Sequence, residues 1–360
     1  MTTVNPVLRL KYNGDFVSGV LNMAGFAETY ARNSDLNYLG TRDTLSLSLD
    51  NSIRRLIPNA SLRIDDSLTY TPLPPGFIRP TAGTSPSDPG NFQNVYAQGF
   101  QASRTDNLIN NATVSTSYAT TSSTSLNASY SYAILRFGSG ASTQGLTLFN
   151  STTQTGGVGG SAGLSEVDTL NVRYTHTQTE FTPIESSSSN TPTTFNADSA
   201  TMGWSRSHTP NLRTELGGGG ILINPGIATY AANAAVIMNS LNNSATLSYA
   251  RSALPNFSGI GGAVGGILIG DVFSLSAVQK IDRQWQLAES VSYTHTSGSG
   301  GIDPVTYDSY IAGGDIQYWM TSAWATSLSY SYSKFNSDLG SANTDFVRQV
   351  IMLSLRATWE

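Results

Sequence analysis

The feature that most constrains this chain is a strict alternation of apolar and polar residues, and its clearest example is the segment 346–360. Taking every second residue places Ile351, Leu353, Leu355, Ala357 and Trp359 on one face, and Arg348, Ser354 and Arg356 on the other. Successive side chains of a β-strand point to opposite faces. The segment is therefore predicted to be a strand with one apolar and one polar face.

Segments of this kind recur along the chain, each close to the roughly 9–11 residues with which a β-strand crosses a membrane. Examples are TLSLSL at 44–49, LNASYSYAILRF at 126–137, LNVRYTHTQTEF at 170–181, AESVSYTHTSGS at 288–299 and SLSYSYSKF at 327–335. In the longer examples the aromatic residues gather toward the end that leads into a long loop. This recurrence predicts an all-β chain of about 16 antiparallel strands, with 14 to 18 left open.

The connections indicate how these strands are arranged. Long connections such as 71–94 alternate with tight turns such as Thr209-Pro210-Asn211, and outer-membrane barrels combine long extracellular loops with short periplasmic turns in this way. Residues 229–238 are Ala-rich, but a hairpin turn at Asn242-Asn243 favours a strand there. We further expect strands at 95–105 and 112–118, one weak strand at 146–153 inside the Gly-rich stretch 138–165, and a Gly-rich loop at 255–270.

Composition narrows the class of protein. Only 12% of the residues are charged, about half the usual share for a soluble domain. Uncharged polar residues with many aromatics suit a barrel that has lipid outside and water inside. The same composition also suits a secreted β-rich adhesin or fibre protein. A net charge of −5 argues against a nucleic-acid partner, which would require a basic surface.

Several kinds of chemistry have no support in the sequence. The chain has no cysteine, which excludes disulfides, thiolate metal sites and covalently attached c-type haem. No run of 18 apolar residues predicts a transmembrane helix, and no signal peptide is recognisable at the start. There is no G-x-S-x-G, H-E-x-x-H or P-loop motif. We therefore expect no enzymatic activity, no cofactor and no metal site.

Two histidines lie in identical Tyr-Thr-His-Thr quartets, at 174–177 and 293–296. A shared metal or pH-sensing site is one interpretation of His176 and His295. No carboxylate stands at a fixed spacing from either histidine, so the pattern lacks a metal signature. We favour the interpretation that both are rim residues on repeated strands.

The polar faces predict the residues that line a pore, and the apolar faces predict aromatic residues at the lipid boundary. Candidate pore-lining residues are Arg9, Lys11, Arg63, Asp65, Arg173, Arg213, Glu215, Asp315, Arg348 and Arg356. Candidate girdle residues are Tyr130, Tyr174, Trp204, Trp285, Tyr293, Tyr330 and Trp359. The mixed charges predict either a pore with weak ion preference or structural salt bridges across the lumen. Asp66 and Glu289 fall on the apolar faces. Either the register of the strand shifts there, or these residues lie near a rim of the barrel or at a contact between subunits.

The chain resembles the outer-membrane β-barrel porins that accompany exopolysaccharide-export gene clusters. The resemblance lies in the Leu/Tyr/Ser/Thr strands quoted above, the hairpin HTPNLRTELGGGG and the segment RQVIMLSLRATWE. It spans most of the chain. It implies passage of a polysaccharide or another solute across the outer membrane. A barrel that sheathes a multihaem cytochrome is a second alternative, although no motif identifies it.

We therefore predict one transmembrane β-barrel domain over residues 1–360, in the outer membrane of a bacterium. The expected function is passive passage of small solutes or a polysaccharide through a polar lumen. Outer-membrane lipid is the expected partner, a periplasmic or export-machinery partner remains open, and the oligomeric state is not specified. The adhesin alternative differs in one observable, because only a barrel has an apolar band about 25 Å tall on its outside.

Overall fold

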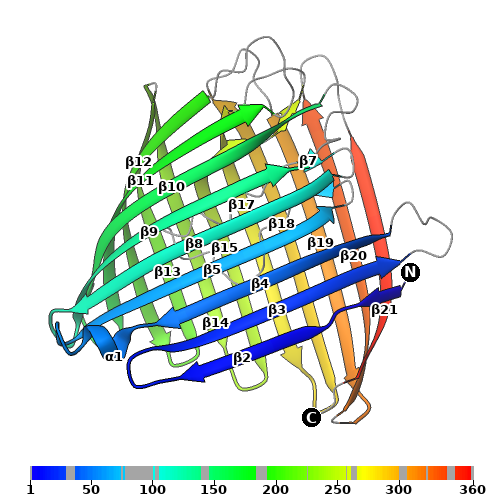
Figure 1. The fold of residues 1–360 in the computed structure, drawn as a ribbon, viewed down its shortest axis with the longest axis horizontal. Helices are drawn as coiled ribbons and strands as arrows, with labels where there is room; N and C mark the ends of the chain where they lie inside the picture. Colours follow the sequence, from blue (N-terminus) through cyan, green and yellow to red (C-terminus); the bar gives the residue numbers. More distant parts are fainter. Residues whose placement is uncertain are drawn as a thin grey trace.

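The computed structural model describes residues 2–29, 37–73, 76–77, 100–101, 105–138, 146–183, 193–224, 226–256, 258–260, 266–299, 306–321, 323–338 and 345–357. Almost all of these residues belong to one antiparallel β-sheet (Figure 1). The one helix among them is the single turn α1 (Asp50–Ile53). In these ranges no helix has the length and apolar character needed to cross a membrane.

Seventeen long strands form the wall of the sheet within the described ranges. They are β2 (Val7–Asn13), β3 (Ser18–Thr29), β4 (Tyr38–Ser48), β5 (Ala60–Leu73), β8 (Thr105–Ala119), β9 (Thr124–Phe137), β10 (Leu146–Gly163), β11 (Asp168–Pro183), β12 (Thr193–Thr209), β13 (Leu212–Asn224), β14 (Ile227–Asn239), β15 (Asn243–Asn256), β17 (Gly266–Lys280), β18 (Trp285–Ser299), β19 (Thr306–Trp319), β20 (Trp324–Asp338) and β21 (Phe346–Ala357). The short strand β1 (Thr2–Val4) also pairs with β3. β6 (Gly76–Phe77) pairs with β7 (Phe100–Gln101), and β16 (Ser258–Ile260) pairs with the start of β10.

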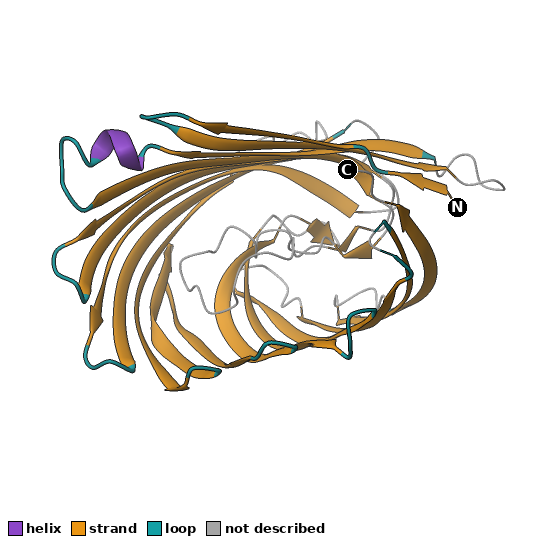
Figure 2. Cartoon of the chain, turned by 90° about the horizontal axis from the view of Figure 1, so that it is seen from below, coloured by secondary structure: helices purple, strands orange, loops and turns teal. Residues whose placement is uncertain are grey.

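Each long strand pairs antiparallel with the next one along the chain, and the sheet curls around an enclosed space (Figure 2). Among the described pairings, β2 and β21 pair on one side only and form the two edges. Because the number of long strands is odd, these two edge strands run in the same direction. The architecture is an all-β antiparallel barrel, as the alternation predicted, and its strand number lies inside the predicted range.

The two faces of this sheet are inverted relative to a soluble protein. Large apolar side chains on the outer, convex face are exposed, as shown by Val158 at 56% and Val172 at 53%. Small polar side chains on the inner, concave face are buried, as shown by Thr155 at 6% and Thr175 at 3%. Side chains crowd on the concave side of a curled sheet, so this burial identifies the inner face. The outer face carries many exposed apolar side chains, which form a band around the sheet.

The connections at the two ends differ in length. At one end, called here the turn end, strands are joined by short links such as 120–123, 164–167 and 210–211. At the opposite end, the loop end, most connections lie outside the described residues. The link between β13 and β14 is an exception, because only two residues separate these strands. Gly226 in that link has φ of 80°, a left-handed conformation that glycine adopts without a steric penalty.

Three expectations about the strands differ from the structure. The strand expected at 112–118 begins earlier, because β8 starts at Thr105. Of the strand expected at 95–105, the structure describes residues 100–101, which form β7, and Thr105. The run Asn107 to Asn111 resembles a turn, yet Asn107 is fully buried on the inner face and Asn110 hydrogen-bonds Asp66. The weak strand at 146–153 is instead the longest strand, since β10 continues through GGVGG to Gly163. Residues 266–270 belong to β17 rather than to a loop.

The two acidic residues that the pattern placed on the apolar face remain there. Asp66 lies opposite Leu45 and Ala112, in a register without a slip. Its carboxylate accepts a hydrogen bond from Asn110 Nδ2 at 3.0 Å, which compensates part of its lost hydration. Glu289 is exposed on the outer face, opposite Ala277 and Gly314. A bulge therefore does not explain either residue.

Candidate functional site

The inner wall is lined mainly by hydroxyl groups that pair across neighbouring strands. Ser61 and Ser117 lie 2.6 Å apart between their Oγ atoms, and the same arrangement joins Ser248 to Ser274 at 2.6 Å. These residues are directly opposite each other in the register of their strands. Each of these hydroxyl groups hydrogen-bonds to one on the neighbouring strand, and the short side chains leave the space inside unfilled. These hydroxyl pairs make parts of the wall polar without long side chains.

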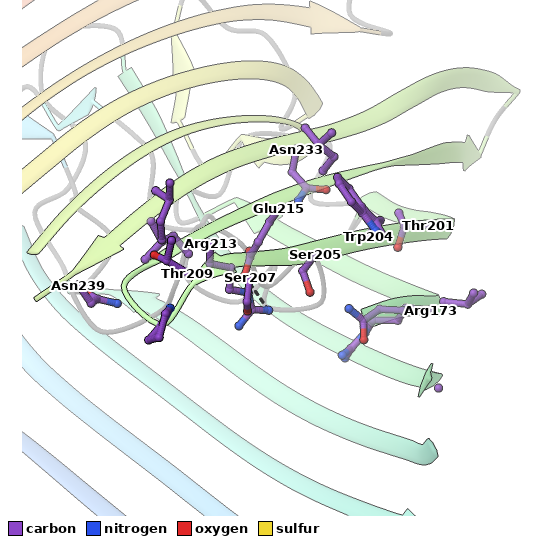
Figure 3. Close-up of a pocket in the computed structure, with 18 of the residues that line it drawn as sticks. Arg173, Thr201, Trp204, Ser205, Ser207, Thr209, Arg213, Glu215, Asn233 and Asn239 are labelled. Atoms are coloured by element: carbon purple, nitrogen blue, oxygen red, sulfur yellow. Dashed lines mark ion pairs between the residues drawn. The ribbon is translucent and has the colours of Figure 1, made fainter. Parts of the chain in front are cut away.

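A hollow of about 630 Å³ lies against the inner side of β11–β14 near the turn end (Figure 3). Its polar lining includes Arg173, Thr201, Ser205, Arg213, Glu215 and Asn233. Figure 3 shows these side chains rising from neighbouring strands. Charged and amide groups are concentrated along this hollow. It is therefore a place where a solute in the lumen meets hydrogen-bonding groups.

Arg173 lies flat against this wall because β10 carries a glycine beneath it. Its Nη2 atom donates a hydrogen bond to Ser129 Oγ on β9 at 3.0 Å, crossing over β10. A Cβ atom on Gly157 would lie 3.1 Å from that nitrogen and 3.2 Å from the Ser129 oxygen. No acidic residue in the described ranges forms an ion pair with Arg173. The guanidinium contributes a positive charge to the lumen.

Four of the predicted pore-lining residues form two ion pairs. Arg63 Nε lies 2.7 Å from Asp65 Oδ2, and Arg213 Nη2 lies 2.9 Å from Glu215 Oε1. The partners are two residues apart on a single strand, so neither pair reaches across the lumen. Glu215 is nearly buried, with its side chain 11% exposed, whereas that of Arg213 is 50% exposed. The interpretation of the lumen charges as salt bridges across the pore does not describe these two pairs.

The remaining predicted pore-lining residues also occupy inner-face positions. Arg9 and Lys11 lie opposite the inner residues Asn22 and Val20, and Arg348 lies opposite the buried Ser333. Asp315 shares this face, whereas the side chain of Arg356 lies outside the described part of the structure. Sequence reasoning missed two inner cations, Arg42 on β4 and Lys280 on β17. Arg42 lies just before the leucine alternation of β4, and Lys280 is the last residue of β17. Only their register relative to Leu45 and Phe273 could have revealed that they face inward.

The predicted girdle residues fall on the outer face in two rows. Tyr130, Tyr174, Tyr293 and Tyr330 lie near the middle of their strands, while Trp204 and Trp285 lie toward the turn end. On β18, Trp285 and Tyr293 are eight residues apart, which is about 27 Å along an extended strand. Further aromatic residues extend both rows, including Tyr249, Phe273, Tyr310 and Tyr318. Trp359 lies outside the described residues.

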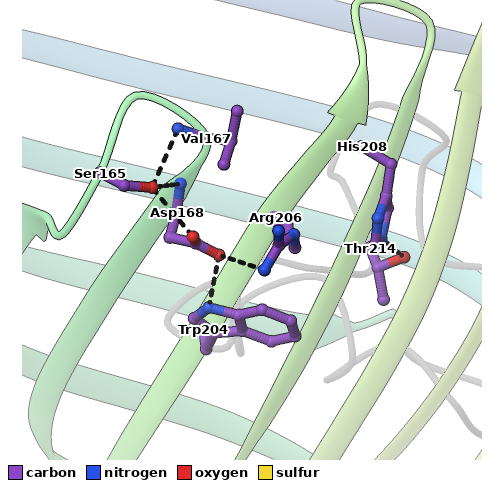
Figure 4. Close-up of polar contacts among 7 residues, drawn as sticks. All are labelled: Ser165, Val167, Asp168, Trp204, Arg206, His208 and Thr214. Atoms are coloured by element: carbon purple, nitrogen blue, oxygen red, sulfur yellow. Dashed lines mark hydrogen bonds and ion pairs between the residues drawn. The ribbon is translucent and has the colours of Figure 1, made fainter.

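A hydrogen bond orients Trp204 at the turn end (Figure 4). Its indole Nε1 donates to Asp168 Oδ1 at 3.0 Å, and Arg206 Nη1 lies 3.7 Å from the same oxygen. Asp168 also accepts a hydrogen bond from Ser165 in the preceding turn. The indole body contacts the apolar band while its polar edge points to the turn, which is how tryptophan sits at a lipid–water boundary.

The two Tyr-Thr-His-Thr quartets have an acidic partner that the sequence did not reveal. Asp198 accepts a hydrogen bond from Tyr174 at 2.6 Å and lies 2.9 Å from His176 Nδ1. Asp308 makes the same contacts with Tyr293 at 2.7 Å and His295 at 2.9 Å. Each aspartate faces its histidine from the neighbouring strand, so the pairing depends on register and has no fixed spacing along the chain. The described residues contain no group of three or more His, Cys, Asp or Glu side chains placed to hold a metal.

At the loop end, one contact joins parts of the wall that are not neighbours. Residues Leu146–Leu148 of β10 pair with Ser258–Ile260 of β16, which follows β15. The strands β11–β14 separate β10 from β15 in the sheet. The contact therefore crosses the curve of the wall. The Gly-rich segment 255–270, expected to be a loop, supplies this strand.

Lipid is the environment that this surface fits. Neighbouring strands of this sheet pair their backbone groups with each other, and apolar side chains face outward, as in membrane-spanning β-structure. Aromatic rows flank such an apolar band in outer-membrane barrels. The protein is an outer-membrane β-barrel.

Comparisons with known proteins find similarity to solved structures alone. No family model matches the sequence, and no curated protein matches it. The ferric-catecholate import receptor Fiu from E. coli K12 is similar with a TM-score of 0.49 and 11% identity, over 98% of this chain and 72% of that chain. The ferripyoverdine receptor of the outer membrane of Pseudomonas aeruginosa has a TM-score of 0.49 and 9% identity, over 99% of this chain and 58% of that chain. The ferric yersiniabactin uptake receptor FyuA from Yersinia pestis has a TM-score of 0.48 and 9% identity, over 99% of this chain and 63% of that chain. The barrel thus spans 58% to 72% of the length of these three chains.

Proposed function

We propose that the barrel is a porin-like pore through which small solutes or a polysaccharide pass down their concentration gradients. The observation that carries this proposal is the inner wall, which is lined by short hydroxyl groups and by charged side chains. Water wets such a wall, and a hydrophilic solute can exchange hydrogen bonds with it while it moves. No covalent chemistry is part of the proposed function.

The outer face separates this proposal from the adhesin alternative. A secreted adhesin presents polar surfaces to water, whereas the described outer face exposes residues such as Ile351 at 74% and Leu353 at 77%. Large exposed apolar surfaces mark contacts with lipid or with another protein. The position of the two aromatic rows on either side of this surface favours lipid.

Passage of a polysaccharide is the finer form of the proposal. Saccharides bind proteins through their hydroxyl groups, and the paired serines and threonines of the inner wall offer donors and acceptors of the same kind. The hollow near Arg173 adds amide groups from Asn127, Asn171 and Asn233. These groups support a path for a sugar polymer as well as for smaller solutes, and the resemblance to the porins of exopolysaccharide-export clusters agrees with it.

Single-channel recording in a planar lipid bilayer tests the proposal. The purified barrel is expected to produce stable, stepwise increases of conductance. In proteoliposomes, uptake of neutral oligosaccharides of increasing length should then measure the size limit. A folded barrel that depends on detergent but gives no conductance and no sugar uptake contradicts the proposed function.

A further inference from the structure

Charge is distributed unequally between the two faces of the wall. The chain as a whole has a net charge of −5. Among the described strand side chains, however, the inner face carries eight cations and three carboxylates: Arg9, Lys11, Arg42, Arg63, Arg173, Arg213, Lys280 and Arg348 against Asp65, Glu215 and Asp315.

The outer face has the opposite balance. Its described strand side chains include nine carboxylates and four permanent cations: Asp43, Asp66, Asp106, Asp168, Glu180, Asp198, Asp271, Glu289 and Asp308 against Arg136, Arg206, Arg251 and Lys334. Some of these carboxylates form ion pairs with cations on the same face, as Asp271 does with Arg251. The acidic net charge of the chain therefore does not describe its lumen.

The inner cations are also mostly unpaired. Two of the three inner carboxylates, Asp65 and Glu215, are neutralised by arginines on their own strands. Within the described residues, the other six inner cations form no ion pair. Among the described inner side chains, Asp315 is the one carboxylate left to oppose these cations. The wall thus presents a net positive field to whatever enters it.

We propose that the lumen selects anions, and that its preferred solutes carry carboxylate, sulfate or phosphate groups. This inference rests on the proposed function, because selection requires an open pore. Six of the eight inner cations are arginines, whose planar guanidinium groups match the geometry of these anions. Charged side chains that line a pore set its ion preference. An acidic sugar polymer or a small organic acid passes more readily than a neutral solute of equal size.

Ionic strength gives the preference a recognisable signature. The Debye length is about 10 Å at 0.1 M salt and about 3 Å at 1 M. A field from wall charges reaches the middle of a wide lumen at the lower salt concentration and is confined to the wall at the higher one. Anion selectivity is therefore expected to be strong near 0.1 M and to fade toward 1 M.

Reversal potentials in a planar bilayer test the inference. A tenfold KCl gradient is imposed, because K⁺ and Cl⁻ diffuse at similar rates in water and the sign of the potential then reports the pore. The wild-type barrel is expected to show a Cl⁻ to K⁺ permeability ratio above about 2 at low salt, where screening is weak. The ratio should approach 1 when both solutions are concentrated.

Matched variants assign the effect to the inner face. The triple variant K11Q/R42Q/R348Q removes three inner cations that form no described ion pair, and it should lower the ratio at least twofold. The triple variant R136Q/R206Q/K334Q removes three outer cations and should leave the ratio unchanged. Because Lys11 and Arg348 lie on the edge strands, where they are exposed, K11Q alone is the variant least expected to disturb folding.

The outcomes separate the two proposals. Conducting steps with a ratio of 1 or below overturn the anion preference and leave the pore function standing. A ratio above 1 that the inner variants do not change also overturns it, because the assigned residues would not carry the effect. A folded barrel without conductance overturns the pore function, and the anion preference with it.

Discussion

Arg173 on β11 and Ser129 on β9 are hydrogen-bonded across an intervening strand, with Nη2 donating to Oγ at 3.0 Å. The bond passes over Gly157 of β10, whose missing side chain leaves the required space. This one relationship connects a sequence feature that resembles a loop, the GGVGG stretch, with the polar hollow of the inner wall.

Gly157→Val is expected to destabilise the barrel by about 1–3 kcal/mol, since added methyl groups in a packed site force neighbours to move. Here they would displace Arg173 and Ser129. Gly156→Val is the matched control, because Gly156 faces outward with nothing within 4 Å of an added Cβ. Urea unfolding in detergent, followed by tryptophan fluorescence, measures both. Equal stabilities of the two variants would contradict the packing described for Gly157.

Arg213→Gln is expected to cost more stability than Glu215→Gln, although both break the same ion pair. Loss of Arg213 leaves a nearly buried carboxylate without its partner, at a cost of about 1–3 kcal/mol. Loss of Glu215 leaves a half-exposed guanidinium that water can solvate, at a cost below about 1 kcal/mol. Arg63→Gln is the control, since the Arg63–Asp65 pair is exposed on both sides. The same unfolding assay ranks the three variants, and the reverse order for Arg213 and Glu215 would refute the argument.

Asp271→Leu is expected to weaken folding in lipid, because it leaves Arg251 without an anion on the outer face. Arg251 Nη1 lies 2.5 Å from Asp271, and its guanidinium stacks 4.3 Å from the ring centre of Tyr230. An unpaired arginine on the lipid face costs up to about 2–4 kcal/mol near the midplane and less near the boundary. The double variant R251L/D271L should recover most of that loss. Folding equilibria in lipid vesicles measure the cycle, and additive losses would show that the two residues do not interact.

Tryptophan depth provides a test of the outer girdle. A variant that keeps only Trp285 should be quenched by lipids brominated near the headgroup more than by lipids brominated near the chain ends. A variant that keeps only Trp319 is the control, because Trp319 lies on the inner face opposite the buried Ala325. Acrylamide in water should quench Trp319, and brominated lipids should not. Similar lipid quenching of both residues would contradict the assigned faces.

The contact between β10 and β16 can be captured by an engineered disulfide. Thr147 and Gly259 are register partners, and the chain has no cysteine of its own. Facing residues of an antiparallel pair are about 4.5–5.5 Å apart between Cα atoms, which a disulfide can span. The double variant T147C/G259C should oxidise readily without changing the conductance. A variant pairing T147C with S244C at the far end of β15 should remain reduced. Failure of the first pair to oxidise would place β16 elsewhere.

The assignment of faces was predictable, whereas most partners were not. Alternation around Leu353, Leu328 and Val172 was sufficient to divide inner from outer residues, because the period of a strand is fixed. The acidic partner of His176 lies 22 residues away and depends on the register of two long strands, which no local pattern encodes. The Gly-rich part of β10 lacks side chains that could show alternation, and its strand conformation follows from the neighbours on both sides. The balance of charge in the lumen needed Arg42 and Lys280, which lie beyond the clearest leucine patterns.

The contact between β10 and β16 also determines an order of assembly. Its two segments are separated by more than 100 residues, and they can meet only after β11–β14 have curved the intervening wall. Contacts between distant parts of a chain form late, because the intervening segment must first lose its conformational freedom. The pairing of β10 with β16 is consequently expected to form only after the intervening strands have taken up their curve.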